Sequence, residues 1–108
     1  MQRRRHSIHF CPSIALRKKG VALFNLGKYK EAISALDSLA YQTFRSRGYV
    51  SACAIALGDK ECARKALAEA ISISPDLTAS KFLKAENYRY PEDAERLRKL
   101  LIAAGLPE

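Results

Sequence analysis

Apolar residues recur along most of this chain at intervals of three and four positions, the spacing that places them on one face of an α-helix. The clearest example lies between residues 29 and 40, where the apolar stripe consists of Tyr29, Ala32, Ile33, Leu36, Leu39 and Ala40. The positions between them are mostly polar, as expected for a helix with one buried and one exposed face. No alternation typical of β-strands competes with this pattern, so the sequence predicts an all-α protein.

The same spacing predicts about six helices. Their approximate ranges are 13–26, 29–40, 44–57, 60–72, 77–88 and 91–104. The third is apolar on nearly every face, which indicates a helix that lies between others. Gly27, Gly58 and Gly105 stand where three of the helices should end, as expected for residues that close a helix in the left-handed conformation. Consecutive helices would form antiparallel pairs at about 13–40, 43–73 and 77–104.

One pattern occurs twice in the chain. Residues 26–36 and residues 57–67 both place Leu-Gly at the end of one predicted helix and Ala-x-x-x-Leu in the next. Ala32 and Ala63, which are equivalent in the two copies, lie 31 residues apart. This is the pattern of a repeated helix-turn-helix unit.

The repeated unit resembles the tetratricopeptide repeat (TPR), a pair of antiparallel helices of about 34 residues with small and bulky residues at fixed positions. The matching positions are Leu16, Lys19, Gly20, Leu23, Ala32, Leu36, Leu39 and Phe44 in the first copy, and Arg47, Val50, Ser51, Ala54, Ala63, Leu67, Ala70 and Pro75 in the second. The resemblance implies an α-α superhelix in which Gly20 and Ala32 let paired helices approach closely. A helical bundle of another kind is the alternative.

A second resemblance covers residues 71–108. These residues are similar to the end of the TPR region that is attached to bacterial class III adenylate or guanylate cyclase-like proteins. The similar segments are Ile71–Thr78, Phe82, Tyr90–Leu97 and Leu101–Glu108. The closing segment Ala104–Glu108 is the most specific part. The resemblance implies a cyclase domain upstream. Related regulators carry the same kind of tail after a winged-helix DNA-binding domain, so both kinds of upstream domain stay open.

The net charge of +8 comes entirely from the beginning of the chain. Residues 1–30 contain eight Lys or Arg and no acidic residue, and the charges of residues 31–108 cancel. Residues 1–12 show no helical period, so we expect a flexible basic arm or the remnant of an upstream repeat. The second hypothesis for function is therefore a nucleic-acid-associated regulator that contacts phosphates through this arm. It is disfavoured because no helix there is patterned to enter a groove.

The cysteine content indicates a reducing environment. Cys11, Cys53 and Cys62 are odd in number and form no Cys-x-x-Cys pair, so neither a disulfide framework nor a zinc finger is predicted. No apolar run reaches the length of about 18 residues that a membrane span needs. We therefore predict a cytoplasmic protein that does not enter a membrane.

No motif for catalysis, metal binding or cofactor binding is found. A phosphate-binding loop, a nucleophile elbow and a His-Glu-x-x-His motif are all absent from the sequence. His6 and His9 would need further ligands held rigidly nearby to bind a metal ion. Cys53 lies on the apolar third helix and Cys62 on the fourth, just past the turn, and a buried cysteine usually packs as a small hydrophobic residue. The sequence therefore predicts a protein that is not an enzyme and has no cofactor.

The TPR resemblance implies a concave groove lined by the first helix of each pair. By this resemblance the groove positions are Arg17, Val21, Phe24, Asn25, Arg45, Gly48, Ala52 and Ile55. The two arginines could bind carboxylates of a partner or simply be solvated, and the asparagine could hydrogen-bond an extended backbone. The Lys and Asn set with which some TPR domains bind a chaperone's C-terminal carboxylate is not reproduced, because Val21 and Tyr49 occupy two of its places.

Together these patterns predict a protein-protein interaction scaffold, the C-terminal TPR-like regulatory or assembly region of an adenylate cyclase-like signalling protein. The expected partner is a protein or peptide, or the chain's own upstream domain. Self-association through an exposed terminal stripe is compatible with so short an array, because about three repeats are usually needed for stability. Nucleic acid is not the expected partner.

Overall fold

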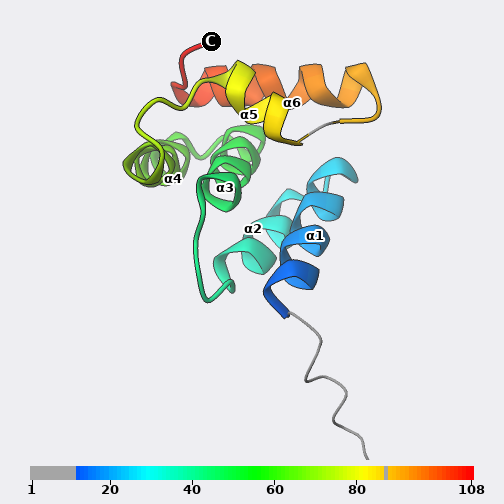
Figure 1. Cartoon of the computed structure of the whole chain (residues 1–108). Helices are drawn as coiled ribbons and strands as arrows, with labels where there is room; N and C mark the ends of the chain where they lie inside the picture. Colours follow the sequence, from blue (N-terminus) through cyan, green and yellow to red (C-terminus); the bar gives the residue numbers. More distant parts are fainter. Residues whose placement is uncertain (1–11, 87) are drawn as a thin grey trace, which may run out of the picture.

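The computed structural model describes residues 12–86 and 88–108, and these residues form helices and no strand (Figure 1). The helices are α1 Pro12–Asn25, α2 Tyr29–Asp37, α3 Phe44–Leu57, α4 Lys60–Ile73, α5 Ala79–Glu86 and α6 Pro91–Ala104. The predicted all-α class is confirmed. Residues 1–11, for which we predicted a flexible arm, lie outside the described residues. No helix in the described part of the chain is long and apolar enough to cross a membrane.

Two helices are shorter than their apolar stripes predict. α2 ends at Asp37 instead of Ala40, because the Gln42 side-chain amide donates to the carbonyl oxygens of Leu36 and Leu39 and holds the chain in a turn. α5 spans Ala79–Glu86 instead of residues 77–88. It begins late because the Thr78 hydroxyl accepts a hydrogen bond from the Lys81 backbone N–H. Side-chain hydrogen bonds of this kind compete with helix extension.

The repeated Leu-Gly positions form two equivalent turns. Gly27 and Gly58 have φ angles of 81° and 82°, which places both in the left-handed region. The next residue in each turn, Lys28 or Asp59, donates its backbone N–H five residues back at 2.8 Å. These bonds satisfy carbonyl groups at the helix ends, as in a Schellman motif. Each turn therefore reverses the chain and pairs α1 with α2 and α3 with α4.

Helix α3 lies at the centre of the molecule. It packs against α2, α4 and α6, and Figure 1 shows it enclosed by these elements. Its N-terminus is fixed by a reciprocal pair of hydrogen bonds, in which Ser46 N–H donates to Thr43 Oγ1 and Thr43 N–H donates to Ser46 Oγ. All residues from Ser46 to Ala54 are buried. The prediction that this helix lies between others is confirmed.

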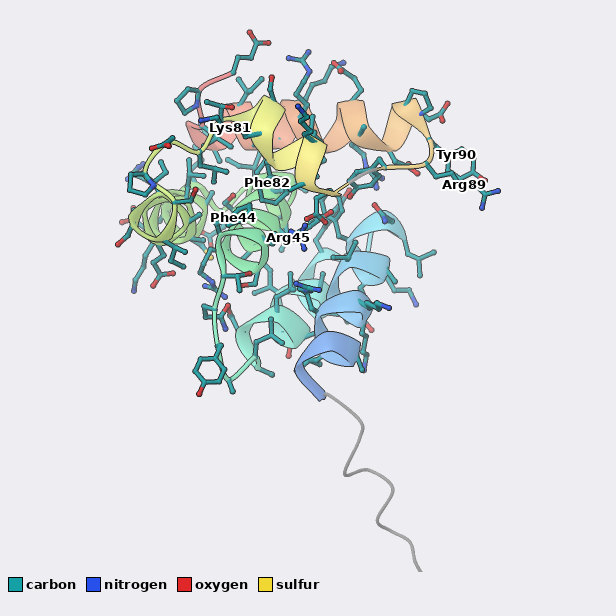
Figure 2. All side chains as sticks on the ribbon, in the orientation of Figure 1. Phe44, Arg45, Lys81, Phe82, Arg89 and Tyr90 are labelled. Atoms are coloured by element: carbon teal, nitrogen blue, oxygen red, sulfur yellow. The ribbon has the colours of Figure 1, made fainter. Side chains whose placement is uncertain are left out.

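The third helix pair does not repeat the packing of the first two. α2 packs along α3, but α5 does not run along α4 in the same way. Instead α6 crosses α3 and also touches α4. The short α5 contacts α3 through Phe82, which lies close to Phe44 in Figure 2. The ring centre of Phe82 is 6.0 Å from that of Phe44 and 5.5 Å from that of Tyr49.

Arg47 joins three helices from inside the fold. Its guanidinium donates to Asp37 of α2 at 2.6 Å, to Glu69 of α4 at 3.3 Å and to the Gln42 side chain at 3.0 Å. Only 9% of the residue is exposed, so these partners supply the hydrogen bonds and charge that burial requires. Arg47 holds a position that is matched to a bulky residue in the repeat, and here its ion pairs link α2, α3 and α4.

Two glycines allow close packing of side chains against the helix backbone. A Cβ atom on Gly20 would lie 2.6 Å from Cδ2 of Leu36, as the predicted close approach of α1 and α2 requires. A Cβ atom on Gly48 would lie 2.3 Å from Cε2 of the fully buried Phe82. Neither position has room for a larger side chain unless its neighbour moves.

We expect Gly48→Ala to destabilise the fold. The clash with Phe82 should lower the free energy of unfolding by about 2 kcal/mol, despite a gain in helix propensity of about 1 kcal/mol. Urea unfolding followed by circular dichroism measures this difference. In a Phe82→Leu background the loss should shrink by about 1 kcal/mol, because neighbouring substitutions interact. An equal loss in both backgrounds would contradict the proposed contact.

Candidate binding groove

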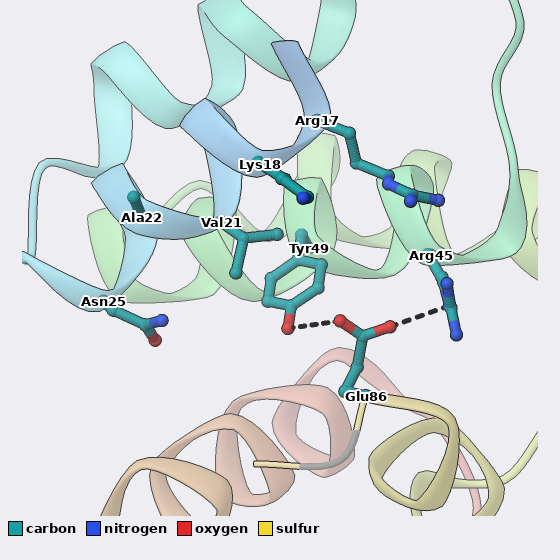
Figure 3. A pocket seen from close by; sticks show the side chains of 8 residues that line it. All are labelled: Arg17, Lys18, Val21, Ala22, Asn25, Arg45, Tyr49 and Glu86. Atoms are coloured by element: carbon teal, nitrogen blue, oxygen red, sulfur yellow. Dashed lines mark hydrogen bonds and ion pairs between the residues drawn. The ribbon is translucent and has the colours of Figure 1, made fainter. Parts of the chain in front are cut away.

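A groove of about 310 Å³ opens between α1, α3 and the end of α5. Figure 3 shows that its lining comes from three segments that are far apart in the sequence. The lining residues are Arg17, Lys18, Val21, Ala22, Asn25, Arg45, Tyr49 and Glu86. Basic groups, an aromatic ring and one carboxylate therefore share a single concave surface.

One wall of the groove is a basic edge of α1. Arg17 and Lys18 stand one helical turn before Val21 and Ala22, so their charged groups lie beside an apolar surface. Arg17 is partly exposed and Lys18 is exposed. Among the side chains that the structure describes, those of residues 15–86 and 88–108, neither has a partner for an ion pair or a hydrogen bond. Their positive charges are thus available to a ligand.

The floor of the groove is Tyr49 of α3. Its ring is buried and packs edge-on against Phe24, with 5.4 Å between the ring centres. Its hydroxyl donates to Oε1 of Glu86 at 2.9 Å and lies 2.7 Å from the Tyr88 hydroxyl. Burial is the main cause that raises the pKa of Tyr49 above its usual range, and the neighbouring Tyr88 and Glu86 raise this pKa further. Tyr49 therefore stays protonated and acts as a hydrogen-bond donor to the carboxylate.

Arg45 and Glu86 form an ion pair across the groove. Nε of Arg45 lies 2.8 Å from Oε2 of Glu86, and Nη2 of Arg45 donates to the Ala85 carbonyl oxygen at 2.8 Å. Figure 3 shows Glu86 between Tyr49 and Arg45. The Glu86 side chain is only 13% exposed. Oε2 accepts no hydrogen bond among the described residues, since the Arg45 contact has the distance of an ion pair without hydrogen-bond alignment.

Contacts near Asn25 bound the groove at the C-terminal end of α1. The Tyr88 hydroxyl lies 3.4 Å from Asn25 Oδ1, and Nη2 of Arg96 donates to the Asn25 carbonyl oxygen at 3.3 Å. The Arg96 guanidinium also stacks over the Phe24 ring, 5.1 Å from its centre. Cationic groups favour this position because the C-terminus of a helix carries partial negative charge.

The structure brings together four of the eight predicted groove residues. Arg17, Val21, Asn25 and Arg45 line the groove. Phe24, Gly48 and Ala52 do not line it, because all three are buried in the core. Phe24 is covered by Tyr49 and Arg96, and Gly48 lies under Phe82.

Two of the predicted roles also change. Ile55 is partly buried and lies outside the lining. Arg45 lines the groove, but its charge already pairs with Glu86.

Four lining residues were absent from the predicted set: Lys18, Ala22, Tyr49 and Glu86. Lys18 and Ala22 directly follow the predicted positions Arg17 and Val21 on α1, so a wider helical face would have included them. Tyr49 occupies one place of the Lys and Asn set of some TPR domains, and its aromatic side chain departs from that pattern. Glu86 carries no local signal, since its position depends on how α5 returns to α3.

The described residues contain no group of three or more His, Cys, Asp or Glu side chains placed to hold a metal ion. Burial raises the pKa of the Cys53 thiol to about 12, and burial likewise raises the pKa of Cys62 above its usual range. Cys53 is thus held as an unreactive thiol in the core. His6, His9 and Cys11 lie outside the described residues.

Searches of protein-family models, curated proteins and solved structures found no match to this chain.

We expect Cys53 to react only when the protein unfolds. In a variant that keeps it as the only cysteine (Cys11→Ser, Cys62→Ser), labelling by Ellman's reagent at pH 8 should be at least about 100-fold slower than in urea, because burial and the raised pKa both suppress the thiolate. The folded state prefers the protonated thiol. The contribution of Cys53 to stability is therefore complete below pH 9 and is lost as the pH rises toward about 12. Equal labelling rates in both states would contradict this placement.

Proposed function

We propose that this chain is a protein-interaction module whose groove binds an acidic, partly apolar segment of a protein partner. The observation that carries the proposal is the position of Arg17 and Lys18. Neither basic residue forms an ion pair with a described side chain, and both stand beside Val21 and Ala22. A partner segment with a carboxylate next to an apolar side chain would satisfy both surfaces.

The composition of the groove supports a peptide as the ligand. Binding sites commonly combine an apolar surface with a few placed polar groups, and here the polar groups are mostly cationic. Asn25 is exposed at one end and can hydrogen-bond a peptide backbone. Electrostatic complementarity of this kind mainly increases association rate and specificity, so the affinity should fall as salt concentration rises.

The sequence resemblance of residues 71–108 supports a place for this module in a cyclase-like signalling protein. The groove would then bind either a separate protein or another segment of the same signalling protein. In each of the two helix hairpins, α1–α2 and α3–α4, a glycine turn of the same geometry joins the two helices. This similarity supports the TPR-like repeat for residues 13–73. The different packing of α5 and α6 makes the third pair a distinct terminal unit in this proposal.

The proposal can be tested with two labelled peptides that differ in one charge. The first contains Leu-Glu-Leu between Gly-Ser flanks, and the second contains Leu-Gln-Leu in the same flanks. Fluorescence anisotropy at low salt should give a Kd about tenfold lower for the acidic peptide, as expected for a charge-assisted contact. The double substitution Arg17→Glu and Lys18→Glu should remove this preference.

A matched control reverses the charge of two lysines outside the groove. Lys28→Glu and Lys30→Glu change the net charge by the same amount, and both residues are exposed near the turn into α2. This variant should keep the preference for the acidic peptide within about twofold, because distant exposed charges are screened. Equal Kd values for the two peptides in the unmodified protein, or equal losses in both variants, would refute the proposed groove.

A further inference from the structure

The groove contains a second group of carboxylate-binding residues besides Arg17 and Lys18. Tyr49 and Arg45 both come from α3 and lie one helical turn apart. Together they contact both oxygens of one carboxylate, the Tyr49 hydroxyl at Oε1 and Arg45 Nε at Oε2. That carboxylate belongs to Glu86 at the end of α5, as Figure 3 shows. The second position is therefore occupied from within the chain.

Glu86 also changes the charge that a ligand meets. Its carboxylate neutralises Arg45, which is held further by the Ala85 carbonyl oxygen. Among the described lining residues, Arg17 and Lys18 are then the cations that carry no ion pair. Both side chains line the groove from α1 and form its cationic wall.

We propose that Glu86 is a specificity-determining residue that acts as an internal carboxylate and limits the groove to partner segments with a single acidic side chain. This inference rests on the proposed function. A second acidic side chain of the partner would face Glu86 and a neutralised Arg45, and like charges at short distance repel. The partner's carboxylate binds Arg17 and Lys18, while its apolar neighbour packs on Val21 and Ala22.

The test uses Glu86→Gln with two labelled peptides in the same Gly-Ser flanks, one containing Leu-Glu-Leu and the other Glu-Leu-Glu. The substitution keeps the size of the side chain and an acceptor for Tyr49, but it removes the negative charge and releases Arg45. The ratio of Kd for the one-acid peptide to Kd for the two-acid peptide should rise about tenfold in this variant, as one added cation and one lost anion act on the second carboxylate.

Two further variants control for general effects of charge and folding. Glu95→Gln on α6 removes a carboxylate that pairs with Arg98 outside the groove, so it should leave the ratio unchanged within about twofold. In Glu86→Gln combined with Arg45→Gln, the gain for the two-acid peptide should disappear, because the released cation is gone. Circular dichroism spectra that match the unmodified protein show that each variant is folded.

The outcomes separate this inference from the proposed function. A selective gain in Glu86→Gln that Arg45→Gln abolishes supports the inference. If the unmodified protein binds the one-acid peptide through Arg17 and Lys18 but Glu86→Gln leaves the ratio unchanged, the internal-carboxylate role is overturned and the groove function stands. If neither the unmodified protein nor Glu86→Gln binds either peptide, both are overturned.

Discussion

The burial of α3 on nearly all sides is the constraint on which the rest of the structure depends. A helix that contacts α2, α4 and α6 at once has little room for large side chains, and its middle is correspondingly built from small residues such as Ser51, Ala52, Cys53 and Ala54. Interiors pack at a density that leaves no tolerance for an added methyl group at such positions. Gly48 shows this most clearly, because it receives the ring of Phe82 and so determines where α5 meets α3.

Arginines provide the polar connections between the helices around this core. Arg47 joins α3 to α2 and α4, Arg45 joins α3 to the end of α5, and Arg96 joins α6 to the end of α1. Two of the three donate to carbonyl oxygens at helix C-termini, which lack partners within their own helix. A guanidinium suits this role because it presents several donors in a fixed plane. These contacts tie the third helix pair to the first two without requiring it to repeat their packing.

The candidate groove follows from the same arrangement. The middle of α3 is buried, Arg45 in its first turn is partly exposed, and α1 borders that edge with Arg17 and Lys18. The return of α5 then adds Glu86, which binds the two α3 residues and leaves the α1 residues open. The electrostatic character of the groove thus depends on one carboxylate contributed by a segment remote in sequence. The proposed recognition of a single acidic side chain depends on this balance between the basic residues of the groove and Glu86.

The sequence by itself determined the all-α class, the approximate helices, the central place of α3 and the two glycine turns, because each depends on local spacing and on residues such as Gly27 and Gly58 with special backbone freedom. It also indicated four groove residues on α1 and α3. Only the tertiary structure decided that α6 crosses α3, that Phe24, Gly48 and Ala52 are buried, and that Glu86 enters the groove. The physical reason is that helical periodicity defines which residues share a face, whereas the element that covers the face depends on packing between distant segments.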